Sequence, residues 1–573
     1  MNAESASRAW PALALLCALT FLAGLGRQAI SDSDEAFYAE AGREMVTGGD
    51  WITPHYNFDV RLQKPILYYW LVAGTYAVAG VGEAQARLWS AMSGIGLALI
   101  AAAVGRRWFS PAAGLIAGAI AATSFGVTML ARMALPDTPL AFFVTLAIWA
   151  AFEALGAPPD SASPTRPADT RGTQRAWLLL CGLSLGLGVL TKGPVALILF
   201  AIIVPPVYAW ERRRRPANYS AARPLHLADV ALGSALAAAI ALPWFAAVTH
   251  AQGAGYLRQF LIGENVDRFA TTQNNDIRSI WFYVPVVAGG LLPWTPFGLL
   301  CLPPLARVLT RRRRLTCLES RLAIWALAPL LFFTISIGKQ PRYVLPCLVP
   351  LAIAVAASLW THLSRRVDGE RRRTSLVSVA TVLTGAGLIA LGAALLRVGP
   401  VFSAATSWSP VGPWLVVLSG AAIASWPWIG RRRSLPLAVT AAAAATGLVV
   451  QFSVYAHGRP EPVELIAAAA AHESNGSPIC ACGAFARNLN FYSHTRTVVG
   501  DPDSEIEQFL SGSSRVVAVI DQRTLRRIET KWDRRLPEIW EIAYLNVAAL
   551  RLHDVLDPDP ARVIQRVILV ANR

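Results

Sequence analysis

The feature that most constrains this chain is a succession of apolar windows, each long enough to cross a lipid bilayer as a helix. We find about thirteen candidate spans, and their approximate limits are 10–26, 86–104, 112–130, 138–155, 176–191, 194–210, 228–249, 280–301, 321–337, 342–360, 375–396, 411–429 and 435–456. A bilayer offers no water to backbone polar groups, so such windows must be helical. The chain is therefore predicted to be a polytopic α-helical membrane protein with about 13 transmembrane helices.

The charged residues support this interpretation and argue against nucleic-acid binding. Only 15% of the residues are charged, and the net charge of +16 comes mainly from short arginine runs between apolar windows, such as Arg106–Arg107, Arg311–Arg314 and Arg431–Arg433. Cytoplasmic loops of membrane proteins have this pattern. Nucleic-acid binding instead needs a basic footprint on one folded surface. We therefore expect no nucleic-acid partner.

The same arginine runs predict the orientation and the domains. With a cytoplasmic N-terminus, the runs fall inside and the C-terminal region falls outside. Residues 1–456 form the predicted transmembrane domain, with outer loops at 27–85 and 250–279. In the first of these loops, the apolar stretch 65–81 predicts a juxtamembrane helix. The tail, 457–573, carries charges throughout and short β-type runs separated by helical stretches, which indicates a soluble α/β domain.

The first outer loop contains an unusual cluster of acids, in the segment SDSDEAFYAE. Helical spacing runs from Glu35 to Met45 and places Asp34 at the start of a helix. A carboxylate is favoured there by the helix dipole and by capping. Asp34 is thus either a helix cap or a residue with a chemical role, and the local sequence leaves both open.

Other ionisable residues lie at the same outer side of the predicted bundle. Asp137 lies at the outer end of the fourth window, Arg61 and Lys64 lie just before the juxtamembrane stretch, and Arg268 lies in the second outer loop. An ionisable side chain at a span edge is costly unless it faces water or a partner. Two acids and three bases predict a polar cavity that handles an anion such as a phosphate. The alternative for Arg61 and Lys64 is contact with lipid headgroups.

Five ordered motifs carry a family resemblance: DEAFYAEAGREMVTGGDWITPHYN with RLQKPILYYW, ARMALPDTPLAFF, GLGVLTKGPVALIL, GENVDRF and SIGKQPRYVLPCLVP. They resemble polyprenyl-phosphate-sugar-dependent glycosyltransferases, membrane enzymes of the C-type glycosyltransferase fold, and most strongly their lipid A aminoarabinose branch, which is related to protein O-mannosyltransferases. The resemblance implies transfer of a sugar such as 4-amino-4-deoxy-L-arabinose from undecaprenyl phosphate to lipid A, at the periplasmic face of the bacterial inner membrane. Another envelope glycolipid or protein Ser/Thr stays open as the acceptor.

The resemblance also implies roles for individual residues. Asp34 and Asp137 match the catalytic acids, and Lys64, Arg268 and Arg61 are expected to hold the donor phosphate. The expected cavity lining further includes Glu35, Tyr38, Lys192 and Tyr343. The aminoarabinose enzymes usually carry Glu, linked with a metal site, where this chain has Gln63. We therefore predict no bound metal, with a divalent cation left open as the one cofactor.

Two other function classes have weaker support. A transporter or lipid flippase would carry acids and broken helices at mid-membrane, usually in paired halves. Here the ionisable residues lie at span ends on one side, and we find no internal repeat. A non-catalytic scaffold would need only loops that bind headgroups. The expected partners are a polyprenyl-linked donor, an envelope acceptor and membrane lipids.

Overall fold

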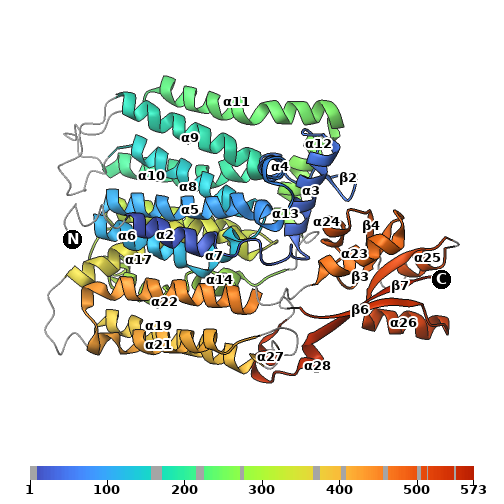
Figure 1. Ribbon diagram of the computed structural model, residues 1–573. Helices are drawn as coiled ribbons and strands as arrows, with labels where there is room; N and C mark the ends of the chain where they lie inside the picture. Colours follow the sequence, from blue (N-terminus) through green and yellow to red (C-terminus); the bar gives the residue numbers. More distant parts are fainter. Residues whose placement is uncertain are drawn as a thin grey trace.

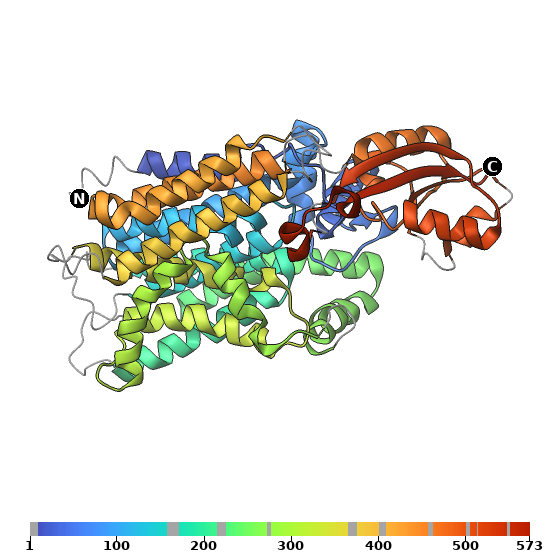
Figure 2. The same ribbon diagram turned by 90° about the horizontal axis from the view of Figure 1, so that it is seen from below.

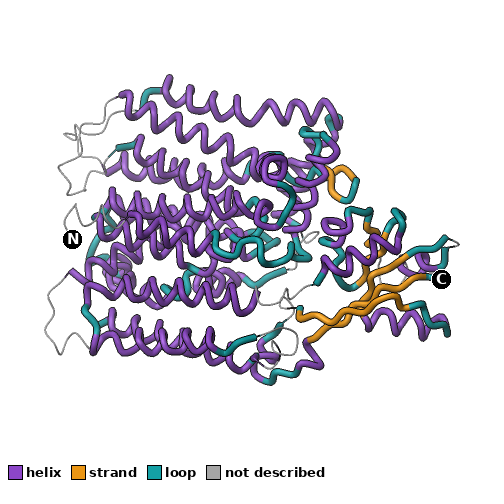
Figure 3. The backbone as a smooth tube through the Cα atoms, in the orientation of Figure 1, coloured by secondary structure: helices purple, strands orange, loops and turns teal. Residues whose placement is uncertain are grey.

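The computed structural model describes residues 10–156, 171–214, 225–271, 277–364, 375–399, 401, 408–455, 462–499, 505–512, 514–546 and 550–573. Its helices run side by side in a bundle, as Figure 1 shows, and Figure 2 shows the same arrangement from below. The N-terminus lies at one end of this bundle, and an α/β unit with the C-terminus projects beyond the opposite end. The colouring in Figure 3 separates the helical bundle from this strand-containing unit.

Within the described residues, ten helical segments are long and apolar enough to span a membrane, which confirms a polytopic membrane protein. They are α5 (Glu83–Trp108), α8 (Asp137–Ala154), α9 (Arg171–Lys192), α10 (Val195–Arg214), α11 (Leu227–Gln252), α16 (Cys317–Ile335), Pro341–Ser364 with α17 (Leu345–Ser364), α19 (Leu376–Arg397), α21 (Val411–Ile429) and Arg432–Phe452 with α22 (Leu435–Val449). A shorter apolar helix, α2 (Trp10–Phe21), precedes them. The figure of about 13 spans stays a prediction.

Two of the predicted windows are not straight helices. Residues 112–130 become α6 (Pro111–Thr123) and α7 (Phe125–Ala131), which are bent by 57° where Ser124 is extended. The Phe125 N–H bonds to the Leu292 carbonyl, at 2.9 Å, instead of continuing its own helix. Residues 280–301 break by 106° between Ile280–Gly290 and Thr295–Leu309. Pro293 lies in that break, and proline interrupts a helix because it lacks a backbone N–H.

Two short helices of the first outer loop lie at the α/β end of the bundle (Figure 1). In α3 (Asp34–Gly48), the cap is Ser33, whose side chain accepts from the Glu35 N–H at 3.3 Å. Asp34 is therefore the first helical residue rather than the cap, and its carboxylate is available for other contacts. The stretch expected to form a juxtamembrane helix contains α4 (Leu67–Ala79), which packs against α3.

The C-terminal unit is a five-stranded sheet with strand order β4-β3-β5-β7-β6. Its strands are β3 (Ile479–Cys482), β4 (Thr497–Val499), β5 (Val517–Asp521), β6 (Glu538–Leu545) and β7 (Ile564–Ala571). β3 pairs in parallel with β4 and β5, whereas β7 pairs antiparallel with β5 and β6. These strands agree with the predicted α/β character of the tail, whose limits at 457–573 stay a prediction.

Alternate strand residues face two separate apolar clusters. Ile479 and Ala481 pack with α23 (Val463–Ser474), whereas Cys480 and Cys482 pack with α25 (Glu505–Leu510) and α26 (Gln522–Trp532). This period of two means that helices cover both faces of the sheet. The two cysteines are fully or almost fully buried and lie on one face, as ordinary core residues.

The α/β unit docks on the first outer loop through polar contacts. Asn57 exchanges two hydrogen bonds with the backbone of Thr497, both at 2.7 Å. Arg496 pairs with Asp59 at 2.8 Å, and the Asn488 side chain donates to the Ile30 carbonyl at 2.8 Å. Residues more than 400 positions apart in the chain are thereby brought together at the α/β end of the bundle.

Candidate functional site

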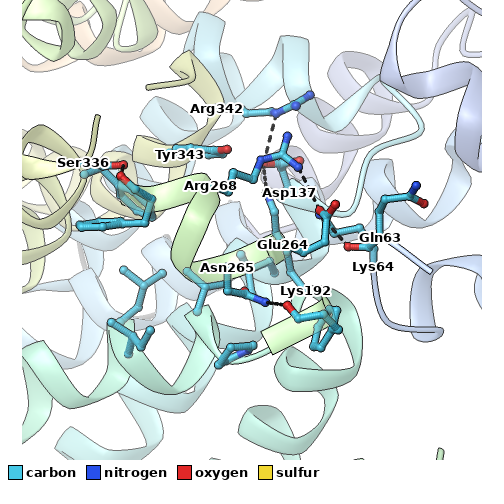
Figure 4. Close-up of a pocket in the computed structure, with 18 of the residues that line it drawn as sticks. Gln63, Lys64, Asp137, Lys192, Glu264, Asn265, Arg268, Ser336, Arg342 and Tyr343 are labelled. Carbon is cyan, nitrogen blue, oxygen red and sulfur yellow. Dashed lines mark hydrogen bonds and ion pairs between the residues drawn. The ribbon is translucent and has the colours of Figure 1, made fainter. Parts of the chain in front are cut away.

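A cavity of about 670 Å³ lies where α3 meets the ends of several spans. Its walls also include residues of the π-helix η1 (Gln259–Asp267) and of the 3-10 turn η4 (Pro341–Val344). Figure 4 shows charged side chains from these different segments converging on the cavity. The cavity is of the size that usually holds a small-molecule ligand.

Eight of the nine residues that the sequence assigned to the site line this cavity. They are Asp34, Tyr38, Arg61, Lys64, Asp137, Lys192, Arg268 and Tyr343. They come from five separate parts of the chain: the first outer loop, the start of α8, the end of α9, the second outer loop and the turn before α17. Their roles in binding or catalysis remain proposals.

Glu35 is the exception, and its expected place in the cavity lining is wrong. Its carboxylate is buried and pairs with Arg87 of α5 at 2.7 Å. It also accepts from the backbone N–H groups of Ser31, at 3.0 Å, and Ala134, at 2.8 Å. Successive residues of a helix point about 100° apart, so Asp34 faces the cavity while Glu35 faces the bundle. Glu35 therefore holds α3 against the spans.

The two predicted acids are joined by Arg342, which the sequence analysis did not select. Arg342 lies 2.5 Å from Asp34 and 3.7 Å from Asp137. Asp137 also pairs with Lys192 at 2.6 Å, and the Lys192 ammonium lies 5.1 Å from the centre of the Tyr343 ring. The signal that could have found Arg342 was its position next to Tyr343 in the motif SIGKQPRYVLPCLVP, at the edge of a span.

The surroundings of Asp34 keep it ionised. Burial raises the pKa of this carboxyl, but the charge and hydrogen bond of Arg342 and the charges of Arg487 and Arg268 oppose burial, so the pKa lies below its usual value. Asp34 is consequently a weak base. Its carboxylate is better suited to orienting a cationic or hydroxyl group than to removing a tightly held proton.

A second cluster brings together the predicted phosphate-binding residues Lys64 and Arg268. Both pair with Glu264, at 2.9 Å and 3.3 Å respectively. Burial lowers the pKa of Lys64 to about 8, although the charge of Glu264 opposes this shift. Glu264 was also missed, even though it lies in the motif GENVDRF four residues before Arg268, a helical spacing that predicts contact.

The third predicted phosphate-binding residue, Arg61, is held by aromatic rings. Its guanidinium lies 3.8 Å from the centre of the Phe37 ring and 5.6 Å from that of Tyr56. Stacking of this kind fixes the plane of the guanidinium and leaves its edge available for an anion.

The cavity combines an excess of positive charge with apolar walls. Its lining contains five basic and three acidic side chains, so it suits a ligand with one or two negative charges. The apolar part of the lining comes mainly from α8, α10, η1 and α16 and includes Leu140, Val195, Ile198, Leu199, Phe260, Leu261, Phe332 and Phe333. Such a lining fits an amphiphile that has an anionic head and a hydrocarbon tail.

The described residues contain no group of three or more His, Cys, Asp and Glu side chains arranged to hold a metal ion. Gln63 lies in the cavity lining, where it supplies an amide in place of a carboxylate. An amide oxygen is a weaker ligand for a hard cation because it carries no charge. The donor set of this part of the site therefore does not fit a resident divalent cation.

Comparisons with known proteins find a family model and several curated relatives that are named for sugar transfer. A family model described as dolichyl-phosphate-mannose-protein mannosyltransferase matches residues 23–250. An undecaprenyl phosphate-alpha-4-amino-4-deoxy-L-arabinose arabinosyl transferase of Pseudomonas paraeruginosa is 34% identical over 392 residues, which are 68% of this chain and 64% of that protein. The corresponding protein of Pseudomonas aeruginosa is 33% identical over 394 residues, 68% of this chain and 65% of that protein. The match thus spans slightly less than two thirds of the length of these relatives.

Among solved structures, the crystal structure of ArnT from Cupriavidus metallidurans bound to undecaprenyl phosphate matches with a TM-score of 0.71. The match covers 98% of this chain and 97% of that chain, at 21% sequence identity. At this identity the likeness shows a shared fold, and it extends over both the helical bundle and the α/β unit.

Proposed function

We propose that this chain, which belongs to the polyprenyl-phosphate-sugar-dependent membrane glycosyltransferases, transfers a sugar from undecaprenyl phosphate to an acceptor outside the bacterial inner membrane. The proposed sugar is 4-amino-4-deoxy-L-arabinose, because the matched relatives are named for its transfer. The proposed acceptor is lipid A. The observation that carries the proposal is one cavity that joins two acids, a cluster of cations and an apolar wall.

The donor would lie with its polyprenyl tail against the apolar wall and its phosphate near Lys64 and Arg268. These two cations already share one carboxylate, that of Glu264, so their positions suit a second anion between them. Arginine binds phosphate oxygens as a fork, and lysine acts as a point charge. Arg61, held over Phe37, would complete the grip.

The reaction would break the bond between the anomeric carbon and the donor phosphate oxygen. The bonding electron pair leaves with that oxygen, and an acceptor oxygen forms the new bond to the anomeric carbon. The departing polyprenyl phosphate gains negative charge, which Lys64 and Arg268 would stabilise. Attack opposite the leaving phosphate, without a covalent intermediate, would invert the anomeric centre.

Asp34 and Asp137 would act at the sugar and the acceptor. The lowered pKa of Asp34 fits an acceptor that is already ionised, since a phosphate of lipid A needs no strong base. Asp34 would then orient the acceptor or the sugar. Asp137 is fixed by Lys192 and faces Arg342, so we assign it the placement of the sugar and of that arginine.

The proposed topology follows from the same interpretation. The N-terminus would be cytoplasmic, and the transmembrane domain, 1–456, would present its cavity to the periplasm. The α/β domain, 457–573, would also be periplasmic. Support comes from the position of the α/β unit at the bundle end opposite the N-terminus (Figure 1) and from the arginine runs between the predicted spans.

The test supplies the purified protein in lipid with radiolabelled undecaprenyl phosphate sugars and either lipid A, other envelope glycolipids or a Ser/Thr peptide. Transfer to lipid A that is lost in Asp34→Asn and in Asp137→Asn, but kept in Asp59→Asn, is expected. Asp59 is a suitable control because it is exposed in the same loop and pairs with Arg496 rather than lining the cavity. Transfer only to peptide would indicate a protein O-glycosyltransferase, and lipid movement without transfer would indicate a flippase.

A further inference from the structure

The α/β unit contacts residues of the cavity lining through Arg487. The backbone of this residue is held on both sides: its N–H donates to Asp32 at 2.7 Å, and its carbonyl accepts from the Tyr56 hydroxyl at 3.0 Å. The neighbouring Ala486 N–H also donates to Asp32, at 3.2 Å. The first outer loop thus fixes the position from which the Arg487 side chain extends.

Arg487 lies at an edge of the sheet where α/β domains commonly bind ligands. Arg487 lies in the loop that leaves the carboxyl end of β3, and β3 is flanked by two parallel strands, β4 and β5. Ligands of open α/β sheets bind beyond the carboxyl ends of the strands, where connections leave to opposite sides. The chain turns sharply there, since Gly483 has a φ of +76° and Phe485 one of +57°.

The side chain of Arg487 is exposed to solvent and lies next to two residues of the cavity lining, Asp34 and Phe37. Its guanidinium lies 3.4 Å from the Asp34 carboxylate and 5.2 Å from the centre of the Phe37 ring, and both of these residues line the cavity. The side chain is 48% exposed, whereas that of Arg342, on the same carboxylate, is 18% exposed. Asp34 is therefore held between a partly buried arginine of the bundle and an exposed arginine of the α/β unit.

Neutralising Asp34 does not require the second arginine. Arg342 already contacts the carboxylate at 2.5 Å, whereas 3.4 Å is long for a charge-assisted hydrogen bond. A guanidinium has five N–H donors, and the contact with Asp34 uses one of them. A half-exposed arginine in this position can bind an incoming anion without a large loss of hydration.

We propose that Arg487 binds the anionic group of the acceptor, so that the α/β unit completes the acceptor side of the site. This inference rests on the proposed transfer to lipid A and names the residue that recognises its phosphate. The donor has a separate set of cations, Lys64 and Arg268, next to the apolar wall of the bundle. Arg487 belongs instead to the α/β unit, which projects beyond the bundle (Figure 2).

The experiment compares Arg487→Ala and Arg487→Lys with a matched control, Arg496→Ala. Arg496 belongs to the same unit, is 45% exposed, and pairs with Asp59 of the same outer loop, outside the cavity. Its loss therefore reports any effect of weaker docking. The full chain is reconstituted in lipid, and kinetics are measured with undecaprenyl phosphate-linked aminoarabinose and lipid A.

The expected result for Arg487→Ala is a rise in the KM for lipid A of about tenfold or more, with the KM for the donor changed less than about twofold. For Arg487→Lys, the KM for lipid A should lie between those of the wild type and Arg487→Ala, because lysine keeps the charge but lacks the forked guanidinium. The control should leave both KM values unchanged.

Three outcomes would overturn the inference: equal effects of Arg487→Ala and Arg496→Ala, equal rises in both KM values, or a fall in kcat alone, which would make Arg487 a positioning residue for Asp34. Direct binding of lipid A to the reconstituted protein separates this failure from that of the proposed function. Binding that depends on Arg487 without any transfer would retain the anion site and refute the reaction. Transfer to lipid A with a KM that does not depend on Arg487 would refute the anion site and retain the reaction.

Discussion

The carboxylate of Asp34 and the guanidinium of Arg342 lie 2.5 Å apart, although 308 positions separate them in the chain. Asp34 begins α3, and Arg342 lies in the turn before α17. Both side chains are partly buried, with exposed fractions of 34% for Asp34 and 18% for Arg342. This contact joins the first outer loop to the spans at the centre of the proposed site.

Replacing Arg342 by Gln should therefore damage catalysis more than folding. The pKa of Asp34 should rise toward its usual value, because its main opposing charge is lost. We expect kcat/KM to fall by about 100-fold or more, as is typical when one preorganised charge is removed from an active site. Initial rates of sugar transfer measure this fall. Arg342→Gln with wild-type rates would show that the pair is only structural.

Arg496→Gln is the matched control for this change. It removes an arginine from an ion pair with Asp59, in the same outer loop, but outside the cavity. The expected change in transfer rate is less than about twofold, since exposed pairs contribute little.

Donor use should depend on the charge of Lys64. Burial lowers its pKa to about 8 in the free protein. Above that pH the ammonium loses its proton and its attraction for the donor phosphate, so kcat/KM for the donor should fall as the pH rises through about 8. The donor is a phosphodiester and does not titrate in this range. Lys64→Arg should abolish the fall, because arginine stays charged; a fall retained in Lys64→Arg would exclude Lys64 as its source.

The sequence predicted the broad architecture because the membrane imposes it. A bilayer forces each apolar window into a helix, so windows such as 86–104 and 228–249 correspond to α5 and α11. Bends were not predicted, because they depend on contacts between distant segments, as in the hydrogen bond from Phe125 to Leu292.

The site was predicted only in part, for a similar reason. The motifs identified which residues gather, but not which face of a helix each one takes: Asp34 reaches the cavity, while Glu35 pairs with Arg87. Arg342 and Glu264 were missed because their importance comes from partners that lie far away in the chain. The pairing of Arg342 with Asp34 across 308 positions, and of Glu264 with Lys64 across 200, leaves no local pattern to read; only the spacing of Glu264 and Arg268 is local.

Glu264 should compete with the donor phosphate for its two cations. Glu264→Gln should lower the KM for the donor by about 3- to 10-fold, since the carboxylate no longer neutralises Lys64 and Arg268. The assay is run at about pH 6 or below, because loss of the Glu264 charge lowers the pKa of Lys64 further. Transfer rates at varied donor concentration measure the KM. Glu541→Gln, which breaks an exposed pair with Arg566 in the α/β unit, should leave the KM unchanged. A higher KM in Glu264→Gln would mean that Glu264 positions the cations rather than competing with the donor.

The proposed topology predicts which end of the bundle is accessible from outside. Ser511→Cys, on the exposed surface of the α/β unit, should react with a membrane-impermeant maleimide in intact spheroplasts. Thr310→Cys is exposed beside the arginine run Arg311–Arg314 and should react only after lysis. The native cysteines are buried or half-buried, so background labelling should be low. Labelling of Thr310→Cys before lysis would invert the topology.

Glu35 and Asp34 provide adjacent positions with opposite expected effects. Glu35→Gln leaves the Arg87 charge buried without its partner, and breaking such a pair typically costs about 3–5 kcal/mol of folding stability. Thermal unfolding in detergent should therefore shift to lower temperature, while the folded fraction keeps the wild-type KM for the donor. Asp34→Asn should do the opposite, with a nearly unchanged unfolding temperature and little transfer, because Asp34 is partly exposed and faces the cavity. If Glu35→Gln abolished transfer without lowering the unfolding temperature, Glu35 would belong to the catalytic site after all.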